Sequence, residues 1–137
     1  MESPVAARFV GRVLLVEDNS INRLISGELL EQLGVQFELA EDGAEALEKL
    51  GAGQFELVLM DCLMPRMDGF TTTRRWREKE RAAGRSRTPI VAVTANASSE
   101  DRERFLAAGM DDFLPKPMQR NRLATILARY LRPAQST

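Results

Sequence analysis

With 137 residues and a formal net charge of -1, the chain has the size of one domain and no bulk charge that favours nucleic acid or an anionic membrane. It contains no histidine and a single cysteine, so a histidine triad, a histidine metal site and an intrachain disulfide are excluded, as suits a reducing cytoplasm. No apolar run approaches the roughly 20 residues that span a bilayer, and the N-terminus lacks a signal-peptide pattern. We expect a cytoplasmic protein whose chemistry uses carboxylates, hydroxyls, lysine or a metal.

Five short apolar runs alternate with five helical patterns along the chain. The runs are rich in leucine and β-branched residues and stand between turn signals, which predicts strands over 13–16, 35–39, 55–60, 89–93 and 112–114. Apolar residues at helical spacing, between capping residues and glycines, predict helices over about 20–33, 43–50, 69–81, 99–108 and 123–131. In the first helix the recurring apolar residues are Ile21, Leu24, Ile25, Leu29 and Leu33.

Strict alternation of strands and helices predicts an α/β fold with a parallel sheet and helices on both of its faces. The common small solution is the flavodoxin-like, doubly wound (βα)5 arrangement with five strands in the order 2-1-3-4-5. We expect one domain over residues 10–132, with a disordered lead-in over 1–9 and a disordered tail over 133–137.

Polar residues follow four of these strands at their carboxyl ends. They are Glu17 and Asp18 after the first strand, Asp61 after the third, Thr94 after the fourth and Lys116 after the fifth. In the 2-1-3-4-5 order these ends are neighbours, so the five side chains are expected to converge. Three crowded carboxylates need a cation, and hard oxygen ligands without histidine or thiolate favour Mg²⁺ over Zn²⁺.

Such a site suits phosphoryl transfer. Asp61 is placed to attack phosphorus, while a bound cation and the Lys116 ammonium neutralise the charge that develops on the phosphoryl oxygens. The Thr94 hydroxyl can donate a hydrogen bond to one of those oxygens. Each residue alone is more simply a helix cap, a turn residue or a solvated side chain, and the functional interpretation depends on their joint placement.

The motifs carrying this arrangement resemble those of the receiver domain of two-component response regulators. They are Leu14–Asn19, Met60–Pro65, Met67–Gly69, Val93–Ala95 and Phe113–Pro117. The resemblance covers residues 10–131, and the segments 16–19 and 64–69 look most like receivers attached to hybrid sensor histidine kinases.

The resemblance implies a role for each residue of these motifs. Asp61 would be the phosphoacceptor, and Lys116 would pair with the phosphoryl group. Thr94 and Phe113 would form the conformational switch. The ligands of Mg²⁺, which Mn²⁺ can replace, would be Glu17, Asp18, Asp61 and the backbone carbonyl of Leu63. The Lys116–Pro117 peptide is expected to be cis, as is common in the family.

The resemblance also implies the partners. The phosphoryl group would come from a phosphohistidine on a histidine kinase or a histidine phosphotransfer protein, since this chain has no histidine. A homodimer would use the last two strands and helices, and no direct contact with nucleic acid or membrane is expected. Such a domain assists only its own phosphorylation and dephosphorylation, so it is not expected to be an enzyme.

Two positions bear on the lifetime of the phosphorylated state. Leu63 lies two residues after Asp61, and Asn96 two residues after Thr94, where the family's side chains flank the path of the attacking water. Because an apolar Leu63 cannot orient that water, we expect slow to intermediate dephosphorylation, which Leu63→Asn should hasten. Cys62, next to the nucleophile, is expected to be a small buried apolar residue rather than a redox sensor.

Three other functions compete with this interpretation. A phosphatase of the haloacid dehalogenase type needs a second aspartate where Leu63 stands, and a flavodoxin-like nucleotide site would place its phosphate against Glu17 and Asp18. A degenerate receiver used only for docking would not need all five site residues. The basic run Arg74–Arg87 is interpreted as a solvated helix face, with Trp76 partly exposed.

Overall fold

The computed structural model describes residues 9–62, 68–95 and 99–133. Five parallel strands form one sheet in the order β3-β2-β4-β5-β6, which is the expected 2-1-3-4-5 order. Their bounds are β2 Arg12–Val16, β3 Gln36–Ala40, β4 Leu57–Asp61, β5 Ile90–Thr94 and β6 Asp112–Pro115. The predicted doubly wound α/β fold is therefore confirmed.

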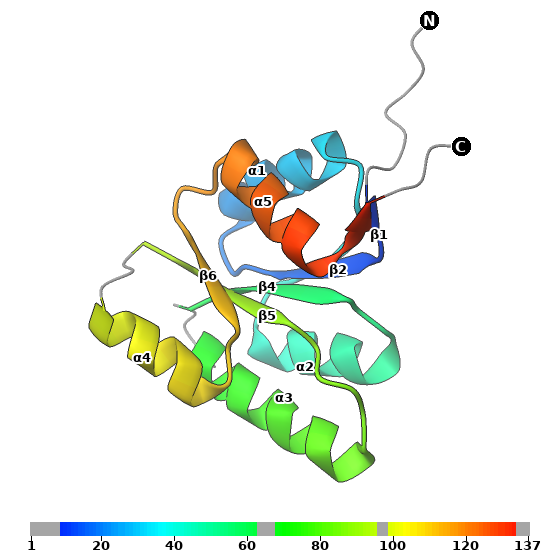
Figure 1. Ribbon diagram of the computed structural model, residues 1–137, viewed down its shortest axis with the longest axis vertical. Coiled ribbons are helices and arrows are strands. Elements are labelled where there is room, and N and C mark those ends of the chain that lie inside the picture. The colour runs from blue at the N-terminus through cyan, green and yellow to red at the C-terminus, as the bar shows by residue number, and fades with distance from the viewer. Residues whose placement is uncertain (1–8, 63–67, 96–98, 134–137) are drawn as a thin grey trace, which may run out of the picture.

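Helices cover both faces of this sheet, as Figure 1 shows. Their bounds are α1 Ser20–Gln32, α2 Gly43–Ala52, α3 Gly69–Ala83, α4 Ser99–Ala108 and α5 Arg120–Tyr130. Helices α1 and α5 lie on one face, and α2, α3 and α4 lie on the other (Figure 1). Helical crossovers between parallel strands are typical of such a three-layer arrangement.

The sheet divides the interior into two apolar clusters, because successive side chains of a strand point to opposite faces. Val13 and Leu15 pack toward α1 and α5, whereas Leu14 and Val16 pack toward α2 and α3. All four side chains are 2% exposed or less, and burying each one contributes about 1.5–3 kcal/mol. The run Val13–Val16 has no alternation of apolar and polar residues, as is typical of a strand that is covered on both faces.

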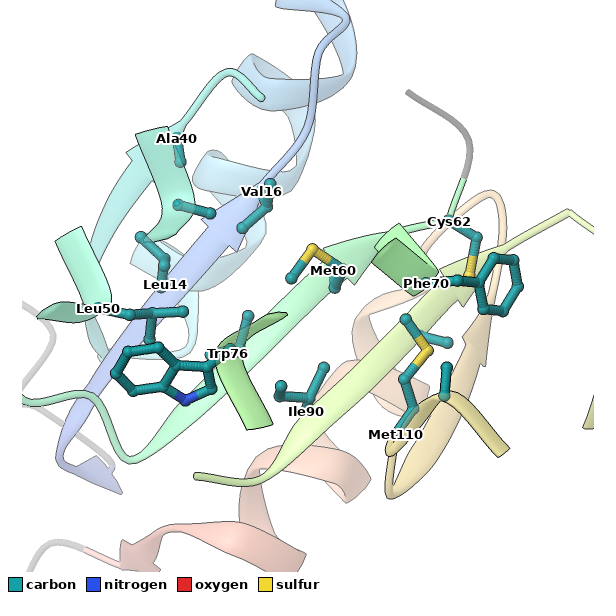
Figure 2. Close-up of a cluster of buried hydrophobic side chains, with 14 of the residues drawn as sticks. Leu14, Val16, Ala40, Leu50, Met60, Cys62, Phe70, Trp76, Ile90 and Met110 are labelled. Carbon is teal, nitrogen blue, oxygen red and sulfur yellow. The ribbon is translucent and has the colours of Figure 1, made fainter. Parts of the chain in front are cut away.

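Trp76 belongs to the cluster between the sheet and α2 and α3. Figure 2 shows its indole lying beside Leu14 and Leu50. The side chain is only 2% exposed, so the expectation of partial exposure is wrong. Helix α3 has few apolar residues, and Trp76, the largest of them, packs against the sheet on this side of the core.

The strand limits differ from the predicted ones in a way that matters for the site. Pro89 has no N–H to donate to a ladder, and β5 accordingly begins at Ile90 and includes Thr94. β4 likewise includes Asp61, which lies opposite Val93 in the register of β4 and β5. Both polar residues are thus fixed by strand pairing instead of standing in the following loops.

Helix α1 forms at the predicted place, but its apolar stripe does not all face the core. Ile21, Leu24 and Ile25 are 66%, 70% and 53% exposed. The helix is packed through Leu30 and through two small residues, Ser26 and Gly27. Helical spacing identifies a helix, but it does not say which side of the helix is buried.

A pair of short strands joins the two ends of the domain. β1 Phe9–Val10 pairs antiparallel with β7 Arg132–Pro133, and this pairing was not predicted from the sequence. In Figure 1 the blue strand β1 lies beside the red strand β7, which follows α5. The domain limits of 10–132 remain a prediction. Within the described ranges, none of the helices combines the length and the apolarity needed to cross a bilayer.

Candidate functional site

The five polar residues predicted from the strand ends lie at the carboxyl edge of the sheet. Carboxylate oxygens of Glu17, Asp18 and Asp61 all lie within 4.8 Å of one another. Lys116 Nζ donates to Asp61 Oδ1 at 2.9 Å and lies 3.8 Å from Glu17 Oε1. The structure thus brings together all three carboxylates and the ammonium group, because β2, β4, β5 and β6 are consecutive in the sheet.

Backbone contacts fix the loop that carries Glu17 and Asp18. The Glu17 N–H donates to Ala40 O on β3 at 3.0 Å, and the Asn19 N–H donates back to Glu17 Oε2 at 3.2 Å. Asn19 Oδ1 accepts from the N–H groups of Ile21 and Asn22, so this residue caps α1. The acidic residues therefore sit between a strand end and a capped helix start.

The loop after Asp61 returns close to the strand at Gly69. The Gly69 N–H donates to Cys62 O at 3.2 Å, and Asp68 caps α3 by accepting from the Thr71 N–H at 2.8 Å. A Cβ atom at position 69 would lie 2.5 Å from Asp61 O, so only glycine permits this approach. Cys62 is buried, as predicted, and burial raises the pKa of its thiol to about 12.

Thr94 and Lys116 lie on neighbouring strand ends. Thr94 is 8% exposed, and its carbonyl accepts from the Lys116 N–H at 2.8 Å. The Lys116–Pro117 peptide is cis, as expected. Movement of Thr94 would therefore be transmitted directly to the backbone that carries Lys116.

Phe113 forms part of an aromatic stack on the α4 side of the sheet. Its ring lies 6.4 Å from that of Phe105, which stacks on Phe70 at 5.8 Å. Arg102 covers the Phe113 ring at 4.6 Å. The two remaining predicted positions, the Leu63 carbonyl and Asn96, lie outside the described residues.

The charge at the site is not balanced by the protein alone. Burial, together with a hydrogen bond and repulsion from Asp61, raises the pKa of Glu17 to about 7. Burial by itself would lower the pKa of Lys116, but the hydrogen bond and attraction to Asp61, with Glu17 and Asp18 adding to the attraction, raise it. A divalent cation would relieve the remaining repulsion, and a set of carboxylate oxygens suits Mg²⁺.

The raised pKa of Glu17 predicts how the stability of the metal-free domain depends on pH. The folded state holds the Glu17 proton up to about pH 7, whereas the unfolded chain releases it near 4.5. Protonation therefore stabilises the fold fully below pH 4.5, and this contribution is lost as the pH rises through 7. With EDTA present, we expect the free energy of unfolding to fall by roughly 1–3 kcal/mol between about pH 5 and pH 8.

Urea unfolding of the wild type and of Glu17→Gln at both pH values checks this expectation. The glutamine variant stays neutral, so its free energy of unfolding should change less across the range. An equal change in both proteins would show that another group titrates.

Sequence reasoning missed one residue beside the site. Arg23 on α1 donates to the backbone carbonyls of both Glu17 and Asp18. Its place in the sequence, in the first turn and a half of a helix, resembles that of any solvated arginine. No local signal distinguishes it, since the contact depends on how the loop folds back over the helix.

Comparison with known proteins agrees with this geometry. Residues 13–128 match the family described as the response regulator receiver domain. Hybrid signal transduction histidine kinase B of Dictyostelium discoideum is 42% identical over 118 residues, which cover 80% of this chain. The match spans 6% of that kinase, so the chain corresponds to a small part of this relative's length.

Two solved structures carry the comparison further. One is the receiver domain of sensor histidine kinase PA1611 from Pseudomonas aeruginosa PAO1, which holds magnesium in its active-site cleft. It is 40% identical to this chain, with a TM-score of 0.78, and the alignment covers 91% of this chain and 98% of that chain. The receiver domain of Ssk1 from Saccharomyces cerevisiae, in complex with the histidine phosphotransfer protein Ypd1, is 30% identical, with a TM-score of 0.86 and 90% of each chain covered. The chain therefore belongs to the response regulator receiver family, whose members are phosphoacceptor signalling modules of phosphorelays rather than true enzymes.

Proposed function

We propose that Asp61 accepts a phosphoryl group from a partner phosphohistidine. The observation that carries this proposal is the cluster of three carboxylates around Asp61 with the Lys116 ammonium 2.9 Å from its Oδ1. In the transfer an oxygen of Asp61 forms a bond to phosphorus while the bond from phosphorus to the imidazole nitrogen breaks. The imidazole leaves with the electron pair of that bond.

The other residues prepare and register this event. Glu17 and Asp18, with Asp61, would hold Mg²⁺, and the cation would neutralise charge on the phosphoryl group during transfer. Lys116 would form an ion pair with a phosphoryl oxygen, and the Thr94 hydroxyl would donate a hydrogen bond to the phosphoryl group. Because the carbonyl of Thr94 binds the Lys116 N–H, both would move together and change the environment of Phe113 on β6.

Mass spectrometry of protein treated with phosphoramidate and Mg²⁺ tests the proposal. We expect one added phosphoryl group on Asp61. No such group should appear when the protein is treated with EDTA before the donor is added. Asp61→Asn should abolish the product. Asp68→Asn is the matched control, since Asp68 caps α3 nearby and asparagine caps a helix equally well. Phosphorylation that survives in Asp61→Asn would refute the assignment.

The partner should dock over α1. A hollow of about 330 Å³ lies between α1 and the loop after β6, and it is lined by Ile25, Met118 and the site residues Glu17 and Lys116. The exposed Ile21 and Leu24 extend the apolar surface along the same helix. A protein that delivers a phosphohistidine to Asp61 across α1 would lie against this rim, and the Ssk1 receiver forms a complex with a histidine phosphotransfer protein.

Removing this apolar surface should weaken transfer from a protein but not from a small donor. We expect Ile21→Ser combined with Leu24→Ser to raise the Kd for a phosphorylated histidine phosphotransfer protein by about tenfold or more. Phosphorylation by phosphoramidate should stay unchanged, because neither residue belongs to the carboxylate cluster. Leu106→Ser is the control, since Leu106 is 66% exposed but lies on α4, across the sheet. Equal losses in both proteins would contradict docking over α1.

Two further parts of the proposal concern context. We propose a cytoplasmic location, where phosphohistidine donors and reduced thiols occur together, and a homodimer through β5, β6, α4 and α5. The alternative, a degenerate receiver that only docks, is disfavoured by the intact cluster of carboxylates and ammonium.

A further inference from the structure

Arg23 is the described side chain that most directly restrains the acidic loop. Its Nη1 donates to Glu17 O at 2.8 Å and to Asp18 O at 3.1 Å, so one nitrogen holds two successive carbonyls. The side chain is 16% exposed, and its Nη2 lies 3.9 Å from Glu41 Oε2. The backbone N–H of Arg23 also donates to Asn19 O, which ties the helix to the same loop.

This restraint opposes the electrostatic repulsion that is expected between carboxylates lying so close together. The carboxylates of Glu17, Asp18 and Asp61 lie within 4.8 Å of one another, and Asp18 is exposed. Without a cation, mutual repulsion drives the exposed carboxylate away into solvent. Because Arg23 holds the backbone carbonyls of this loop, the loop does not move outward with the repelled carboxylate. The ligands therefore stay near the positions that a cation needs.

We propose that Arg23 is a positioning residue that preorganises the Mg²⁺ site by holding the carbonyls of Glu17 and Asp18. It does not touch the cation, and its positive charge by itself opposes cation binding. Its favourable effect comes from conformational restraint, as for other groups that orient metal ligands from behind.

The two effects of Arg23 have opposite signs, and substitutions separate them. Lysine at position 23 keeps the charge, but its ammonium nitrogen is one atom nearer the backbone than Arg23 Nη1 and lacks the second nitrogen that faces Glu41, so it cannot reproduce this set of contacts. Glutamine removes the charge as well. If restraint dominates, both variants bind Mg²⁺ more weakly; if charge dominates, the lysine variant is unchanged and the glutamine variant binds more tightly.

The chain offers a matched control at Arg85. This arginine also donates to two backbone carbonyls, those of Leu50 and Gly53, both at 3.1 Å. It lies after α3, beyond the opposite end of the sheet from the carboxylate cluster. Arg85→Lys therefore reproduces the general loss of an arginine–carbonyl contact without disturbing the acidic loop.

The experiment measures Mg²⁺ binding to the unphosphorylated domain by NMR titration, with thermal unfolding in EDTA as a measure of stability. We expect Arg23→Lys and Arg23→Gln to raise the Kd for Mg²⁺ by about tenfold, and Arg85→Lys to change it by less than about twofold. The amide signals of Asp18 and Asn19 should broaden in the metal-free Arg23 variants.

Three results would overturn the proposal: an unchanged Kd in Arg23→Lys, a lower Kd in Arg23→Gln, or an equal rise in Arg85→Lys. The proposal rests on Mg²⁺ binding at the proposed phosphoacceptor site, but the Mg²⁺ titration uses no phosphoryl donor. Failure of phosphorylation therefore leaves this test intact, and failure of the wild type to bind Mg²⁺ would contradict the metal site itself.

Discussion

Replacement of Lys116 with methionine is expected to slow phosphorylation of Asp61 by about 10²- to 10³-fold. Removing one preorganised donor to a developing oxyanion has costs of this order. Lys116 Nζ is 2.9 Å from Asp61 Oδ1, so it is already placed where a phosphoryl oxygen on Asp61 would arrive. Stopped-flow or quench measurements with phosphoramidate and saturating Mg²⁺ give the rate.

The same substitution should strengthen Mg²⁺ binding. The ammonium group lies beside Asp61 and 3.8 Å from Glu17, and its removal leaves the carboxylates with more uncompensated charge. A slower transfer with a lower Kd for Mg²⁺ distinguishes the loss of a catalytic charge from general unfolding, which would weaken both. Lys116→Arg keeps the charge and should leave the Kd close to that of the wild type. Unchanged phosphorylation in Lys116→Met would remove this residue from the mechanism.

Arg77→Met is expected to destabilise the fold by roughly 3–5 kcal/mol, the usual range when one partner of a buried ion pair is removed. Arg77 donates to Glu80 Oε1 at 2.8 Å, to Asp111 Oδ2 at 2.9 Å and to Gly109 O at 2.9 Å. Glu80 is 4% exposed, so the substitution would leave a buried carboxylate without its arginine partner. Urea unfolding at pH 7 measures the change.

Two controls identify the origin of the loss. Arg74→Met, on the exposed side of the same helix, should change the free energy of unfolding by less than about 0.5 kcal/mol. The double variant Arg77→Met with Glu80→Leu should be more stable than Arg77→Met alone, because no carboxylate is then buried without its arginine. If the single and double variants were equally destabilised, lost packing would be the better explanation.

Arg77 also shows where sequence reasoning went wrong. The basic run over 74–87 was interpreted as a solvated helix face, which holds for Arg74 and Arg75 but not for Arg77, at 5% exposed. The residues that bury it, Gly109 and Asp111, follow α4 and lie more than 30 positions away. A helical pattern places Arg77 on one side of α3, but only the packing of α4 and β6 makes that side buried.

The sequence by itself determined the five strands of the sheet and the residues at their carboxyl ends, because hydrophobic periodicity and turn residues act locally. It did not fix the strand order, for which 2-1-3-4-5 was only the most common of the few topologies that parallel connections allow. The convergence of Glu17, Asp18, Asp61 and Lys116 was expected on the assumption of that order, and the structure confirms it. Tertiary structure alone decided which faces are buried: it exposed Ile21 and Leu24, enclosed Trp76 and Arg77, and turned Arg23 onto the acidic loop. The physical reason is that burial and long-range hydrogen bonds depend on neighbours supplied by distant segments, and the local pattern of a helix contains no record of them.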